Sequence, residues 1–109
     1  MNTGCRMSIS FTKSIVNQLQ KEIADIELKL NTDKKKKEKA QAKIIQVQRD
    51  MKLSQSHSDL SSKLSRINKL NEEIKTVDRL QRDLSKQLLA KKASLKQNLA
   101  KESKQSEDQ

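Results

Sequence analysis

The sequence predicts an all-α protein, a long antiparallel helical hairpin of the coiled-coil kind that assembles into a multi-helix oligomer. Two observations support this fold class. Apolar residues recur at alternating steps of three and four along two long stretches, and a serine-rich passage, "SQSHS" at 54–58, separates the stretches. A 3.5-residue repeat kept over several heptads is typical of a coiled-coil seam and is not maintained by a strand or a disordered segment.

The composition argues against a globular domain. Hydrophobic residues make up 32% of the chain, charged residues 35%, and Phe11 is the only aromatic residue. Such a chain cannot fill a compact core to the usual packing density. One glycine, no proline and many lysines, leucines and glutamines are instead the profile of a coiled coil.

The first stretch predicts a helix over about 12–53. Nine of its eleven a and d positions are apolar, and the exceptions are Asp33 and Lys37. These two lie four residues apart, so they can pair along the helix. Polar residues in a seam lower stability but fix register and partner number. The apolar seam residues are Val16, Leu19, Ile23, Ile26, Leu30, Ala40, Ile44, Val47 and Met51.

The second stretch predicts a helix over about 59–102. Eight of its twelve seam positions are apolar: Leu60, Ile67, Leu70, Ile74, Val77, Leu84, Leu88 and Leu95. Lys63, Gln81, Lys91 and Asn98 interrupt the rows, and leucines beside three of them widen the stripe. A wider stripe is suited to packing against more than one helix.

The serine-rich passage predicts a turn at about 54–58. Serine caps the first turn of a helix well, so Ser56 or Ser58 can be the N-cap of the second helix, and Asp59 suits its positive end. Folding back there sets "KKKKEK" (34–39) opposite the acidic "NEEIKTVD" (71–78). A continuous rod is the alternative, because no proline or glycine forces the turn. Residues 1–11 are expected to be a flexible leader and 103–109 a polar tail or linker.

No catalytic, cofactor-binding or metal-ligating residue is assigned. His57 among serines can suggest a nucleophile and base, but a triad needs a third group and a buried pocket, so a capped turn is the favoured interpretation and no enzyme activity is expected. Phosphorylation of these serines is a second alternative. Cys5, the single cysteine, gives no intrachain disulfide, and no segment resembles a membrane span or a secretory signal, so the expected location is cytoplasmic with no membrane partner.

The net charge of +10 is spread along the chain. Spread positive charge attracts polyanions without specificity, yet it also keeps helical proteins soluble. Nucleic acid is not the expected partner, because no stacking aromatic residues accompany the lysines. The run Lys34 to Lys37 is interpreted as a solvated face paired with acids of the second helix rather than as a phosphate site.

Apolar residues outside the seam predict self-association. A two-helix hairpin with one seam buries little apolar surface for its length, and helices from other copies would cover the remainder. The residues assigned to contacts between copies are Leu28, Ile45, Leu80 and Leu89.

Residues 43–102 resemble the N-terminal coiled-coil region of bacterial TIR-domain (toll/interleukin-1 receptor) proteins. The similarity lies in Lys43, Ile44, Val47 and Gln48 before a serine turn, then in "SDLSSKLSRI" (58–67), and then in "DLSKQL" (83–88). The resemblance implies a module that drives the oligomers of an NAD-cleaving effector domain. No βαβ pattern follows residue 102, so no catalytic residue is carried over.

The expected function is therefore a non-enzymatic oligomerisation scaffold, with itself as partner and an effector domain C-terminal to this segment. Two alternatives use the same hairpin and charge. One is a small basic chaperone or adaptor for another protein, such as a secretion ATPase, and the other is polyanion binding through the lysine run, which salt would weaken steeply.

Overall fold

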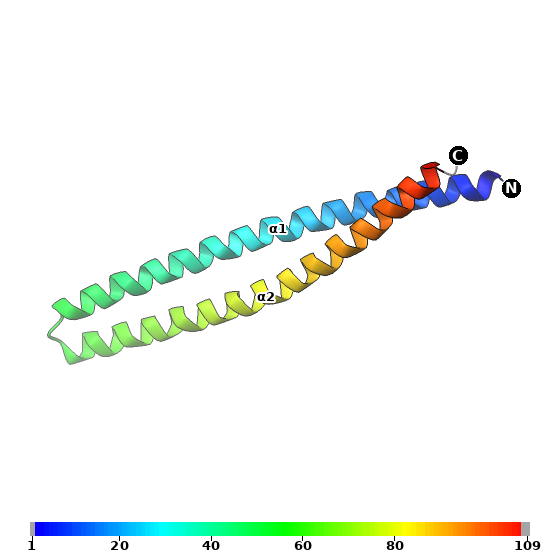
Figure 1. The fold of residues 1–109 in the computed structure, drawn as a ribbon. Coiled ribbons are helices and arrows are strands. Elements are labelled where there is room, and N and C mark those ends of the chain that lie inside the picture. The colour runs from blue at the N-terminus through cyan, green and yellow to red at the C-terminus, as the bar shows by residue number, and fades with distance from the viewer. Residues whose placement is uncertain (1, 108–109) are drawn as a thin grey trace. The chain divides into compact units, whose positions relative to one another are not determined.

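The computed structural model describes the backbone of residues 2–107 and the side chains of residues 11–102. Within this part there are two helices, α1 (Asn2–Leu53) and α2 (His57–Glu107), and no strand. The chain reverses direction at residues 54–56, so α1 and α2 form an antiparallel helical hairpin (Figure 1). The predicted all-α hairpin is confirmed, and the alternative of one continuous helix is wrong.

The turn is closed by backbone and serine hydrogen bonds. The Ser54 amide donates to the Met51 carbonyl at 3.2 Å, which tightens the last turn of α1. The Leu60 amide donates to the Ser56 carbonyl at 3.0 Å, and the Asp59 amide donates to Ser56 Oγ at 3.3 Å. This is N-cap geometry, so the capping prediction is confirmed for Ser56. The turn is correspondingly shorter than the predicted 54–58.

The phase of the two apolar stripes explains why the chain folds back. Met51 ends the seam of α1 and Leu60 begins the seam of α2, nine residues later. Nine residues span about 2.5 turns of an α-helix, so in a continuous helix the second stripe would lie on nearly the opposite face from the first. A break after Leu53 releases this constraint and lets both stripes face each other.

The helices extend beyond their predicted ends. α1 begins at Asn2 rather than near residue 12, and α2 ends at Glu107 rather than near residue 102. The predicted leader over 1–11 is therefore helical from Asn2 on. The reason is local: these segments contain no proline, so no missing amide or ring clash interrupts the backbone hydrogen bonds that continue into them.

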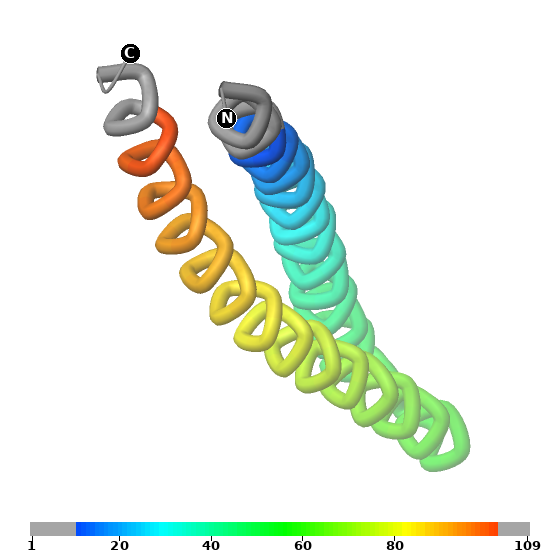
Figure 2. The backbone as a smooth tube through the Cα atoms, turned by 90° about the vertical axis from the view of Figure 1, so that its right-hand side faces the viewer, coloured from blue at the N-terminus to red at the C-terminus, as the bar shows by residue number. Residues whose placement is uncertain are grey.

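The hairpin divides into two compact units. Unit 2, Leu30–Asp83, contains the turn and the helical segments on either side of it, which lie side by side in both views (Figures 1 and 2). Unit 1 contains the described residues of Met1–Lys29 and Leu84–Gln109. The most buried apolar residues of unit 1 are Val16, Ile23, Ile26 and Leu84, and those of unit 2 are Ala40, Val47, Ile67, Leu70 and Val77.

Candidate functional site

The seam between the helices contains every apolar residue that the sequence assigned to it. Each of these residues is buried or half-buried. Thr12, one step before the predicted start of the seam, is also buried at 7% exposure. It continues the three-four spacing back from Val16, so the sequence signal was present but the residue is polar. No side chain in the described part is less than 2% exposed, which is the consequence of a core only two helices wide.

Three lysines interrupt the seam, and each of them is half-buried beside a carboxylate. Lys37 Nζ lies 2.6 Å from Asp78 Oδ1 across the helices of unit 2. Lys91 pairs with Glu22 across the helices of unit 1. Their alkyl stems cover the seam while the ammonium groups reach its edge.

The third seam lysine, Lys63, pairs with Asp59 one turn earlier in α2. Ion pairs at a solvated edge contribute little to stability, because water screens the attraction and the side chains lose freedom. Lys37–Asp78 and Glu22–Lys91, two of the ion pairs across the helices, each join positions at similar distances from the turn. They therefore favour one register of the hairpin more than they stabilise it.

The predicted pair between Asp33 and Lys37 is not formed. Lys37 reaches across to Asp78 instead, because Asp33 occupies a d position with its side chain inside the seam. Asp33 is only 7% exposed, and its Oδ2 has no hydrogen-bond partner. Leaving a buried polar atom unpaired costs free energy, so Asp33 is a local defect in the core of unit 2.

Two carboxylates have lowered pKa values. The hydrogen bond from Lys91 lowers the pKa of Glu22 below its usual range. The hydrogen bond from Lys63, followed by one from Ser54, lowers the pKa of Asp59. Both carboxylates are therefore charged at neutral pH and stabilise the cations that face them.

The side chains of the serine-rich turn form hydrogen bonds that cap α2 and close the turn. Ser56 caps α2, Ser54 bonds to Asp59, and Asp59 is also bound by Lys63. His57 is the exposed first residue of α2. The hydrogen bonds of Ser54, Ser56 and Asp59 therefore cap α2 and close the turn.

The four residues assigned to contacts between copies lie at the surface of the hairpin. Leu28 is 66% exposed and Leu89 72% in unit 1, while Ile45 is 50% exposed and Leu80 41% in unit 2. The seam leaves these apolar side chains in contact with solvent. Other large apolar residues share this exposure: Phe11, Leu53, Leu64 and Leu99.

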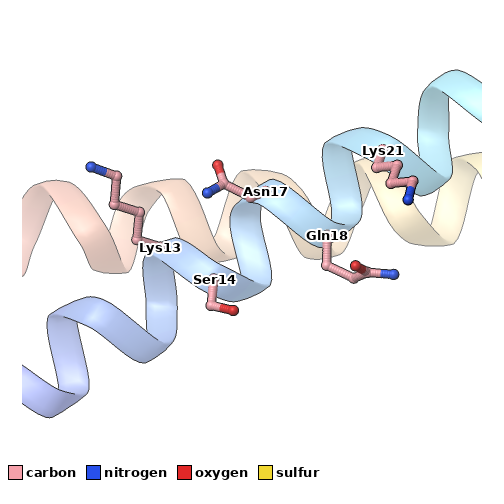
Figure 3. A pocket seen from close by; sticks show the side chains of 5 residues that line it. All are labelled: Lys13, Ser14, Asn17, Gln18 and Lys21. Atoms are coloured by element: carbon pink, nitrogen blue, oxygen red, sulfur yellow. The ribbon is translucent and has the colours of Figure 1, made fainter.

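Two shallow surface grooves differ in chemistry. The first lies on α1 of unit 1 and is lined by Lys13, Ser14, Asn17, Gln18 and Lys21. These side chains fan outward from one helix and do not converge on a common point (Figure 3). This surface is a solvated helix face. The second groove, near the turn, has a mainly apolar lining.

The lysine run has one member inside the hairpin and the others outside. Lys34, Lys35 and Lys36 are exposed, whereas Lys37 is half-buried against Asp78. Of the acids predicted to face this run, Asp78 pairs with Lys37. Glu72 pairs instead with Lys75 at 3.4 Å within α2.

Among the described residues, no group of three or more histidine, cysteine, aspartate or glutamate side chains has the geometry of a metal site. No helical segment in the same part has the length and hydrophobicity needed to cross a bilayer. Comparison with known proteins gives no match to a protein family, to a curated protein or to a solved structure.

Proposed function

We propose that this chain is a non-enzymatic oligomerisation scaffold that self-associates and clusters an attached or partner effector domain. The observation that carries the proposal is the exposure of large apolar side chains that lie outside the seam. Leu28 and Leu89 in unit 1 and Ile45 and Leu80 in unit 2 are each at least 41% exposed. Association of several hairpins would remove these apolar side chains from water.

The side chains proposed to meet between copies come from both units. Leu28 and Leu89 are the most exposed of the four residues assigned to contacts between copies. Each lies outside the seam of unit 1. Association through such residues leaves the seam of each hairpin intact. Clustering raises the local concentration of the joined domains, so that weak contacts between them become populated. The resemblance of residues 43–102 favours a TIR-type NAD-cleaving domain as the effector.

The direct test is absolute mass by light scattering over a concentration series at low and high salt. A multimer at both salts supports the scaffold, because apolar contacts persist when charges are screened. A helical monomer at all concentrations contradicts it.

A pair of matched variants tests the assembly face. Leu89→Ser should leave the helical circular dichroism unchanged and reduce the mass, since Leu89 is 72% exposed and outside the seam. Leu53→Ser, at a residue 85% exposed and not assigned to contacts between copies, should change neither. An unchanged mass for Leu89→Ser would show that the assembly face lies elsewhere.

A second candidate is a small basic adaptor or chaperone for another protein, such as a secretion ATPase. The pairs Lys37–Asp78 and Glu22–Lys91 favour it, because they complete the hairpin within one chain without a second copy. This function predicts a folded monomer alone and a stable complex with a separate protein, so the same mass measurement distinguishes the two candidates.

A further inference from the structure

A groove near the turn of unit 2 combines an apolar floor with a basic rim. It is lined by Ile45, Gln48, Arg49, Met51 and Lys52 from α1 and by Leu60 from α2. Ile45 is 50% exposed, while Met51 and Leu60 are half-buried and continue into the seam. The groove is therefore an accessible extension of the hydrophobic core.

The cations of this groove have no carboxylate of their own. Within the described part of the chain, neither Arg49 nor Lys52 forms an ion pair. Two acids close to them in sequence have other partners: Asp50 accepts a hydrogen bond from Gln46 at 3.2 Å, and Asp59 is bound by Lys63. The positive charge of the rim is thus available to carboxylates from outside.

The geometry of the groove suits a helix. Ile45, Arg49 and Lys52 follow each other at steps of four and three, so they form one ridge along α1. A second helix packs beside such a ridge by placing its own side chains in the adjoining groove. Apolar residues at helical spacing would meet Ile45 and Met51, and flanking carboxylates would meet the two cations.

We propose that this groove, termed here the tip groove, binds an acidic amphipathic helix of a partner protein. A second copy placing its own groove here is a poorer occupant, because Arg49 and Lys52 would then face the same two cations, and like charges in juxtaposition are unfavourable. The acidic helix satisfies both features of the groove, whereas a polyanion without apolar side chains satisfies only the rim.

The tip groove is independent of the proposed self-association except at one residue. Ile45 belongs to the set assigned to contacts between copies, and it also lines the groove. We assign Ile45 to the contact with the partner helix, and Leu28, Leu80 and Leu89 to the contacts between copies. The Ile45→Ser variant separates these assignments: it should weaken helix binding and leave the mass unchanged.

The probe is a fluorescein-labelled peptide of three heptads with leucine at a and d and glutamate at e and g. Its glutamates oppose self-pairing of the peptide, so it is available to the full-length chain. Fluorescence anisotropy is measured at moderate salt with wild type and with two double variants of equal charge change. Arg49→Glu/Lys52→Glu reverses the rim, and Lys13→Glu/Lys21→Glu reverses the polar groove of Figure 3.

We expect the rim variant to bind the peptide roughly tenfold or more weakly, and the distant variant to bind within about twofold of wild type. Equal losses in both variants would mean non-specific attraction and would overturn the inference. So would equal binding of a peptide in which the leucines are replaced by glutamine. A lower mass for Ile45→Ser with unchanged peptide binding would return Ile45 to the contacts between copies and likewise overturn it. Circular dichroism confirms that each variant keeps its helices.

Discussion

Replacing Asp33 by leucine should stabilise the hairpin. The residue is 7% exposed at a d position of the seam, and its Oδ2 has no hydrogen-bond partner. Asp33→Leu removes this unpaired acceptor and sets an apolar side chain at a buried position of the seam. Because Lys37 pairs with Asp78, the substitution breaks no ion pair of the seam.

The magnitude follows from the two effects. Burying a leucine side chain contributes about 1.5–3 kcal/mol, and removing an unsatisfied buried polar atom contributes about 1–3 kcal/mol. The two overlap, so we expect the free energy of unfolding to rise by roughly 2–4 kcal/mol. At about 4 °C per kcal/mol for a chain of this size, the melting temperature should rise by roughly 8–16 °C.

The assay is urea and thermal unfolding followed by circular dichroism at 222 nm. Protein concentration is held constant, because association is linked to apparent stability. Asp25→Leu is the matched control: Asp25 is exposed on the same helix, so the change should stay within about 0.5 kcal/mol. Equal or lower stability of Asp33→Leu, with helicity kept, would refute the argument that Asp33 is an unsatisfied defect of the core.

Three further outcomes are expected. Ser56→Ala should lower the free energy of unfolding by about 0.5–2 kcal/mol, because it removes the N-cap of α2, whereas the exposed Ser61→Ala should change it little. Ala40→Asp should abolish the cooperative unfolding transition at 222 nm, since it adds a second unpaired carboxylate to the core where Ala40 is 4% exposed; a normal transition would contradict the seam. The pKa values of Glu22 and Asp59 are lowered in the folded state, so each carboxylate contributes stability that is fully present at neutral pH. This contribution is lost as the pH falls below about 4 and through the folded-state pKa values. In an acid titration of the melting temperature, Glu22→Gln should show a shallower loss than wild type, and an identical slope would exclude Glu22 as a source.

Most of the fold can be predicted from the sequence. The three-four spacing of apolar residues determines both helices and the seam, because a helical residue's face depends only on its position in the repeat. The phase between Met51 and Leu60 disfavours a continuous helix with one stripe, although this signal is weaker than a proline or glycine would have been. The serines of the turn indicate a cap, and Ser56 fills that role.

Only the tertiary structure identifies the ion-pair partner of each polar seam residue. For Lys37 the sequence offers Asp33 on the same helix and a set of acids on the other, at similar expected distances. Only the packed hairpin decides, because it places the Asp33 side chain inside the seam and Asp78 within 2.6 Å of the ammonium group. The tip groove has the same origin, since Ile45 and Leu60 come together only when the helices pack. Periodicity along one helix is local, whereas the reach of a long side chain depends on the register of two helices, and that is why the sequence determined the hairpin and the structure decided its contacts.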